Sequence, residues 1–182
     1  MMSPANDEIY AYWNGLRGSR PAPQRSQFDP SELRHLLPDL FILNDEPGSS
    51  PCFRLTGTRL YNLFGRELRG TSLCELWTPQ EADYASRIAK GVMQHELPVL
   101  FNLSAFAADA EPLGHYEMLL LPLRSDEIAC DRILGALISE RSFQPLAAPV
   151  SRFSLQRSRL LSLDHVHRKT PTNDERNLRT AS

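Results

Sequence analysis

The sequence predicts an α+β domain, in which a five-stranded antiparallel sheet carries helices on one face and is preceded by an N-terminal helix. Three observations favour this architecture. Helix caps and helically spaced apolar residues dominate the first half of the chain, an alternation with a period of two begins after Pro98, and the loops between the last strands are short. Short loops favour antiparallel neighbours, and the helices then gather on one side of the sheet.

Residues 1–27 are expected to form one helix and a proline-rich connector. Asn6 can cap this helix, because its side chain can accept from the free N–H groups of the first turn. Apolar residues then recur at helical spacing until Gly18: Ile9, Trp13 and Leu16. The run Asp29-Pro30-Ser31-Glu32 resembles a capping box, so a second, short helix is expected as far as Leu37.

The middle of the chain alternates short strands and helices. Strands are predicted over residues 40–43 and 52–56, separated by the turn-forming run NDEPGSS. A short helix, TRLYNLF, lies between Gly57 and Gly65, and another can start at Ser72 with Glu75 as its capping partner. The longest helix is expected at about 79–96.

Three more strands are expected at residues 99–105, 115–123 and 132–140, so the folded domain is predicted over residues 28–141. Residues 142–182 contain seven basic and three acidic side chains and few strand formers. We therefore expect a basic, disordered tail after a linker at 145–149.

Composition excludes several classes of protein. With 20 basic and 22 acidic side chains and a net charge of −2, the chain lacks the basic face of a nucleic-acid binder. It has no long apolar run for a membrane span and no secretory signal, so a cytoplasmic protein is expected. Three widely spaced cysteines form no disulfide framework or zinc motif, and the close-set Asp164, His165 and His167 lack the geometry of a dedicated metal site.

Three segments extend this interpretation: residues 12–43 with W…LR…R…P.R…DP..L...LP, residues 53–70 with FRLTGTRLYNLFGRELRG, and residues 117–125 with EMLLLPLRS. Together with the order of elements they resemble the PAS fold, and in particular the bacterial stand-alone subfamily PAS_5. The resemblance covers residues 8–141. It implies a small sensory or protein-interaction module without a fused catalytic domain.

Four arginines fall within the central motif: Arg54, Arg59, Arg66 and Arg69. One interpretation is that they cap helix ends and pair with Glu67, Glu75 or Asp39. The other is that Arg54 and Arg59 point into the cleft, where a guanidinium can hold a carboxylate or phosphate. The candidate ligand-binding residues are Arg54, Thr56, Thr58, Arg59, His115 and Tyr116.

No cofactor is expected. The resemblance to flavin-binding PAS domains would place a reactive cysteine near Cys74, but the neighbours Leu73, Glu75 and Leu76 do not match that motif. A haem ligand would come from the long helix, where His95 is the candidate. Its place in the last turn is explained more simply by the helix dipole.

Two segments concern partners. A short helix with an exposed tryptophan must bury it on its own sheet or on a neighbouring chain, and we expect a homodimer through Ile9, Tyr12, Trp13 and Leu16, with a monomer as the alternative. Residues 153–163 could form a partner-docking or membrane-surface helix, although three interleaved arginines are too few for stable membrane attachment.

The leading functional hypothesis is a non-enzymatic sensory module that acts by binding an unidentified signalling protein and is gated by a small ligand in the cleft. The alternative is a primary sensor of an anionic or apolar metabolite, which requires a preformed pocket. An enzyme is disfavoured, because only His115, Tyr116 and Glu117 could supply converging polar groups.

Overall fold

The structure is a computed structural model that describes residues 1–140 and 146–163. Its centre is one antiparallel sheet with the strand order β2-β1-β5-β4-β3-β6. The strands are β1 (Leu40–Asn44), β2 (Cys52–Thr56), β3 (Val99–Phe106), β4 (Pro112–Leu123), β5 (Arg132–Ser139) and β6 (Arg152–Leu160). The α+β class is confirmed, but the sheet has six strands where five were predicted.

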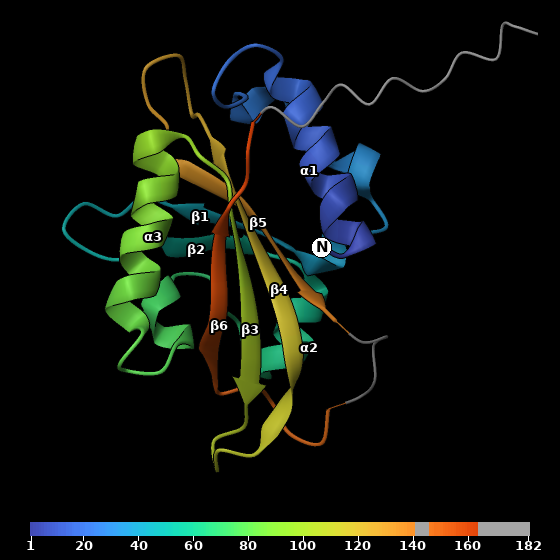
Figure 1. The fold of residues 1–182 in the computed structure, drawn as a ribbon, viewed down its shortest axis with the longest axis vertical. Helices are drawn as coiled ribbons and strands as arrows, with labels where there is room; N and C mark the ends of the chain where they lie inside the picture. The colour runs from blue at the N-terminus through green and yellow to red at the C-terminus, as the bar shows by residue number, and fades with distance from the viewer. Residues whose placement is uncertain (141–145, 164–182) are drawn as a thin grey trace, which may run out of the picture.

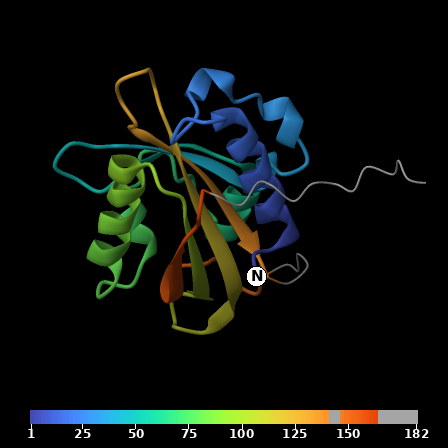
Figure 2. The same ribbon diagram turned by 45° about the horizontal axis from the view of Figure 1, so that its top comes forward.

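Helices lie on both sides of this sheet (Figures 1 and 2). The inner face packs against α2 (Thr58–Phe64), the 3₁₀ helix η4 (Leu73–Leu76) and α3 (Ala82–His95). The outer face is covered by α1 (Pro4–Arg17) and by the 3₁₀ helices η1 (Arg25–Gln27), η2 (Pro30–Leu33) and η3 (Leu37–Asp39). The predicted short helix from Asp29 is therefore a 3₁₀ turn. Its expected cap is present, with the Asp29 carboxylate accepting from the Ser31 N–H at 2.9 Å.

Helix α1 is bound to its own sheet. Ile9 and Trp13 are fully buried, and the Trp13 Nε1–H donates to the Pro122 carbonyl at 2.8 Å. The predicted dimer contact is therefore wrong for these two side chains, which have no surface left for a second chain. The tryptophan is buried within its own chain because α1 lies over β4 and β5, which satisfies both its apolar ring and its indole N–H.

The start of α1 is held by a buried carboxylate. Glu117, on the outer face of β4, accepts from the Ser3 backbone N–H at 2.8 Å and from Asn6 Nδ2 at 3.0 Å. Negative charge is stabilising at this end of a helix, where backbone N–H groups have no partner within the helix. Ser3 is the N-cap, so the prediction that Asn6 caps α1 is wrong.

The predicted disordered tail is also wrong for part of its length, because residues 152–160 form β6 along the free edge of β3. Phe153 is fully buried, with its ring 5.7 Å from Phe64 and 6.4 Å from Trp77. The Thr78 N–H donates to the Phe153 carbonyl at 3.0 Å, and the Glu81 carboxylate accepts from the Leu155 N–H at 3.0 Å. The strand is thus joined both to the sheet and to the segment before α3.

The chain continues from β6 to the outer layer. The Tyr10 hydroxyl donates to the Ser162 carbonyl at 2.7 Å, and Arg17 Nη2 donates to the Leu163 carbonyl at 2.8 Å. Residues 161–163 thereby link the edge of the sheet to α1. Residues 164–182, including the Asp164, His165 and His167 triplet, lie outside the described residues.

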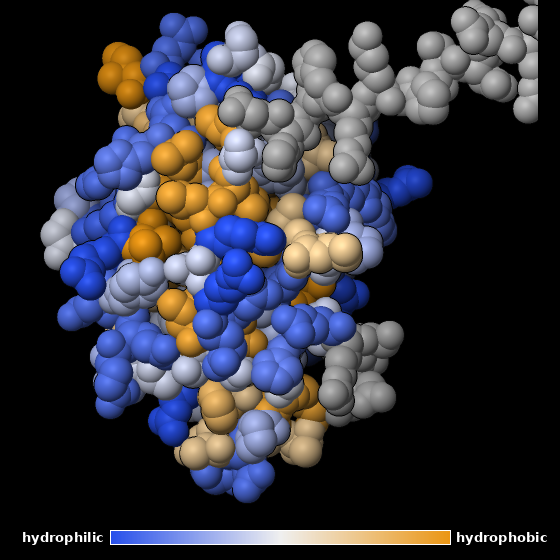
Figure 3. Space-filling model, in the orientation of Figure 1, coloured by the Kyte–Doolittle hydropathy of each residue, from blue (hydrophilic) through white to orange (hydrophobic). Residues whose placement is uncertain are grey.

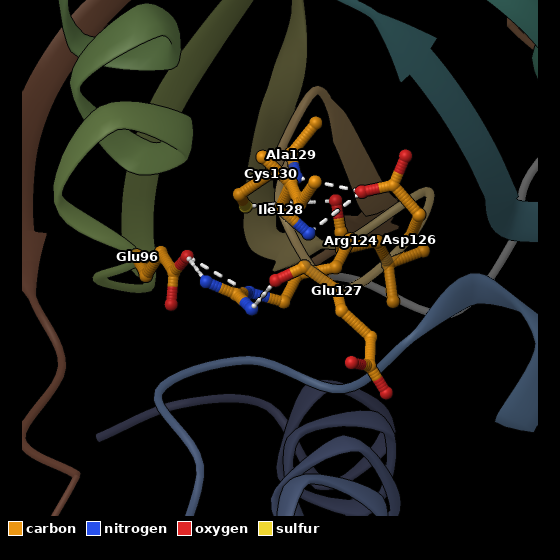
Figure 4. Close-up of polar contacts among 8 residues, drawn as sticks. Glu96, Arg124, Asp126, Glu127, Ile128, Ala129 and Cys130 are labelled. Carbon is orange, nitrogen blue, oxygen red and sulfur yellow. Dashed lines mark hydrogen bonds and ion pairs between the residues drawn. The ribbon is translucent and has the colours of Figure 1, made fainter.

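The far end of α3 is connected to the β4–β5 loop (Figure 4). Arg124 donates through Nε and Nη2 to Glu96 Oε1 at 3.0 and 2.8 Å, and through Nη1 to the Glu127 carbonyl at 2.8 Å. This double contact holds both guanidinium and carboxylate in one geometry.

Within the part of the chain that the structure describes, no helix is long and apolar enough to cross a membrane.

Candidate functional site

A pocket of about 660 Å³ lies at one end of the inner face. It is enclosed by α2, the start of β4, the end of β5 and residues 146–149, the stretch predicted to be a linker. Most of its wall is apolar, with Leu60, Leu63, Pro112, Leu113, Leu137, Leu146 and Pro149. The polar side chains are Asp39, Arg59, Asn62, Tyr116 and Ser139.

The charged part of the wall is an ion pair between Arg59 of α2 and Asp39 at the end of η3. Gly57 allows α2 to start directly against η3, because a Cβ there would lie 2.3 Å from the Leu37 and Pro38 carbonyl oxygens. The Asp39 side chain is 5% exposed, and burial raises the pKa of its carboxyl while Arg59 opposes the shift. The interpretation that the central arginines pair with nearby acids is thus confirmed for Arg59.

Tyr116 is the buried polar group of the pocket. It lies on the inner face of β4, 7% exposed, with its ring 5.9 Å from that of Phe153. Burial raises the pKa of its phenol. Its hydroxyl forms no hydrogen bond with any of residues 1–140 or 146–163. A buried tyrosine usually finds such a partner, so the pocket offers an unused donor and acceptor.

His115 was predicted to join Tyr116 in the cleft, and for its side chain this is wrong. Adjacent residues of a strand point to opposite faces, and Tyr116 belongs to the inner core. The His115 ring lies on the outer face, where Nδ1 is 3.2 Å from the Ser104 hydroxyl. His115 therefore reaches the pocket wall only through its backbone, whose carbonyl accepts from the Glu140 N–H at 3.0 Å.

The remaining candidates stand apart from the pocket. Arg54 is exposed on the edge strand β2, and Thr58 is exposed at the start of α2. Thr56 donates to Glu67 Oε1 at 3.3 Å. The structure therefore brings together only Arg59 and Tyr116 from the predicted set of side chains.

Sequence reasoning missed most of the apolar wall. Leu137 and Ser139 follow the inner-face alternation of β5, a signal that was available. Leu146 and Pro149 lie in a stretch with no periodicity, and nothing local indicates that it folds back over α2. The pocket wall there depends on the return of the chain into β6.

The space between η4, α3 and the sheet does not fit a flavin. It is filled by buried side chains, with Trp77 and Phe101 ring centroids 5.3 Å apart and Leu73 and Met93 beside them. Cys74 is half-buried, and its Sγ lies 3.2 Å from the Ser72 hydroxyl. Among the described residues, no group of three His, Cys, Asp or Glu side chains could hold a metal ion.

The fold and the pocket define the class of protein: an α+β domain with one antiparallel sheet between helices and a largely apolar pocket on its inner face. The family model of the PAS domain matches residues 1–138, and the chain belongs to this family. A search of curated proteins found no match.

Solved structures with a similar fold include three light-oxygen-voltage (LOV) proteins. The Rhodobacter sphaeroides LOV protein is 15% identical, with a TM-score of 0.46 over 62% of this chain and 69% of that chain. A LOV domain studied with a flavin analogue is 15% identical, with a TM-score of 0.47 over 62% and 84%. The dark structure of the Aureochrome1 LOV domain is 14% identical, with a TM-score of 0.46 over 63% and 85%.

Proposed function

We propose that this chain is a non-catalytic, cytoplasmic PAS sensory module, in which a small molecule binds the pocket beside α2 and alters contact with another protein. The observation that carries the proposal is the Tyr116 hydroxyl, which lines a preformed pocket and has no hydrogen-bond partner among the described residues. The hydroxyl is therefore free to donate to, or accept from, a ligand that enters the pocket.

The residues of the pocket wall limit which chemical class of ligand can bind. Its side chains are mainly apolar, and the Arg59 charge is already compensated by Asp39. An anion would bring a second negative charge towards the Asp39 carboxylate. The pocket therefore favours a compact apolar molecule with one hydrogen-bonding end and no net negative charge, over the anionic metabolite that the arginines of the sequence suggest.

A structural change caused by ligand binding can be transmitted to the surface through β6. Phe153 contacts Tyr116 directly, and the strand that carries Phe153 continues into residues 161–163 beside α1. A ligand that moves the Tyr116 ring would therefore act on a strand that is connected to both layers of the domain. This path supports protein contact as the output of the module.

The test compares the native and denatured masses of the purified protein, followed by thermal shift with a panel of small neutral compounds. Leu63→Trp places an indole in the pocket, and Ile128→Trp adds the same group at a side chain that is 92% exposed. We expect the bound mass or thermal stabilisation to be retained in Ile128→Trp, lost in Leu63→Trp and weakened in Tyr116→Phe. Ligand binding that survives in Leu63→Trp would show that the pocket is not the binding site.

A further inference from the structure

The outer face of β6 carries a row of arginines. Arg152, Arg157 and Arg159 lie opposite Phe106, Asn102 and Leu100 of β3, respectively. Leu100 belongs to the outer core beneath α1, and cross-strand partners share a face of the sheet. All three arginines therefore point to the outer side, away from the ligand pocket. We call them the β6 arginine row.

A β-bulge places these arginines on one face. Leu155 pairs with Leu103 and Arg157 pairs with the adjacent Asn102, so Gln156 is an extra residue in β6. Without it, strict alternation would turn Arg157 and Arg159 to the inner face, the side of α3. The bulge thus keeps Phe153 and Leu155 in the core and brings the two later arginines into line with Arg152.

The β6 arginine row is electrostatically unsatisfied. Within residues 1–140 and 146–163, none of the three guanidinium groups has an ion pair or hydrogen bond, and the Arg159 Nε is buried without a partner. The nearest outer-face positions of β3 and β4 are neutral or already engaged: Ser104 and His115 contact each other, and Glu117 holds the start of α1. The exposed Arg157 leaves its guanidinium donors open, so the row is suited to an external acceptor.

The surroundings indicate what kind of acceptor. Hydrophilic side chains gather along the middle of the face over β6 and β3, with an apolar area above them (Figure 3). A short row of three guanidinium groups beside apolar surface suits an acidic protein segment better than a nucleic-acid backbone, whose dense negative charge needs a broad basic field.

The edge of β6 is partly blocked as a site for strand pairing. The Thr78 N–H and the Glu81 carboxylate already occupy the main-chain groups of Phe153 and Leu155. Recognition therefore depends on the side chains of the outer face. Arg157 and Arg159 are two residues apart in a strand, a rise of about 6.6 Å, which equals the spacing of alternate side chains in an extended peptide.

We propose that the β6 arginine row is a docking surface for an acidic segment of a partner protein, with carboxylates at alternate positions of an extended chain. This inference goes beyond the proposed function and is independent of ligand binding, because the row and the pocket lie on opposite faces of the sheet.

The experiment uses the full chain and a fluorescein-labelled peptide of six Glu-Thr repeats, with fluorescence anisotropy as the readout. A Gln-Thr peptide, a single-stranded oligonucleotide and vesicles containing phosphatidylserine are measured in parallel. The variant Arg157→Gln/Arg159→Gln is matched by Arg34→Gln/Arg69→Gln, which removes the same charge from exposed positions elsewhere. The single variant Arg157→Gln, at an exposed side chain, serves if the double variant has a lower urea midpoint than the wild type.

We expect the wild type to prefer the Glu-Thr peptide, and the Arg157/Arg159 double variant to bind it about tenfold more weakly. The Arg34/Arg69 control should remain within about twofold of the wild type, since long-range charge alone is screened by salt. The proposal is overturned if the wild type does not bind the Glu-Thr peptide, if both double variants lose the same affinity, or if the oligonucleotide or the vesicles are preferred.

Discussion

Phe153 provides the sharpest test of where this domain ends. The sequence places residue 153 in a disordered tail, whereas the structure buries its ring completely between Phe64, Trp77 and Tyr116. The substitution Phe153→Ala removes that ring and leaves the rest of β6 unchanged. If β6 is part of the folded unit, this single change must destabilise the whole domain.

The expected loss follows from the burial of the side chain. Truncating a fully buried phenylalanine to alanine costs about 3–5 kcal/mol, and each lost edge-to-face ring contact contributes about 0.5–1.5 kcal/mol beyond buried area. With three ring partners, we expect a decrease of about 4 kcal/mol in the free energy of unfolding. At a urea dependence of about 2 kcal/mol per molar, the midpoint falls by about 2 M.

The assay is equilibrium unfolding in urea, followed by tryptophan fluorescence. Leu160→Ala, at an exposed side chain of the same strand, is the matched control and should change the free energy by less than about 0.5 kcal/mol. A Phe153→Ala protein within about 1 kcal/mol of the wild type would refute the reasoning. It would mean that β6 is not packed on the domain and that residue 141 is the true boundary.

Three further predictions concern single positions. Gly57→Ala should lower the free energy of unfolding in urea by about 3 kcal/mol, because its Cβ would lie 2.3 Å from two backbone oxygens. Gly15→Ala in α1, with open space around it, should instead raise that free energy by about 1 kcal/mol. Equal effects of the two substitutions would contradict this prediction. Burial raises the pKa of the thiol of Cys130, the cysteine labelled in Figure 4, to about 12. Mass spectrometry should therefore find alkylation by iodoacetamide at pH 8 more than about a hundredfold slower in the folded protein than in urea. Burial also raises the pKa of Asp39 above its ordinary 3.8, so the folded state binds that proton more tightly than the unfolded chain. The wild type should therefore gain stability relative to Asp39→Asn as the pH falls from 7 towards 4, and a change of the opposite sign in urea titrations would count against a buried Asp39.

Local signals were sufficient for the elements in which neighbours along the chain decide the conformation. The Asp29 cap and the Ser72–Glu75 capping box form as their spacing predicts, whereas the long helix expected at about 79–96 starts only at Ala82. The predicted alternation of β3 also holds, since its Val99, Phe101, Leu103 and Ala105 all lie in the inner core. Alternation along β4 also places the side chains of the adjacent His115 and Tyr116 on opposite faces of the sheet, so only one of them can point into the cleft.

The sequence by itself therefore determined the helices, the first five strands and the family, since caps, periodicity and the central motif are local properties of the chain. Only the tertiary structure decided the role of residues 146–163. Their mixture of arginine, serine and leucine has no clear period, because the bulge at Gln156 interrupts the alternation. Phe153 becomes a core residue only where Phe64, Trp77 and Tyr116, from three distant segments, leave room for its ring. The pocket wall and the β6 arginine row follow from that long-range contact.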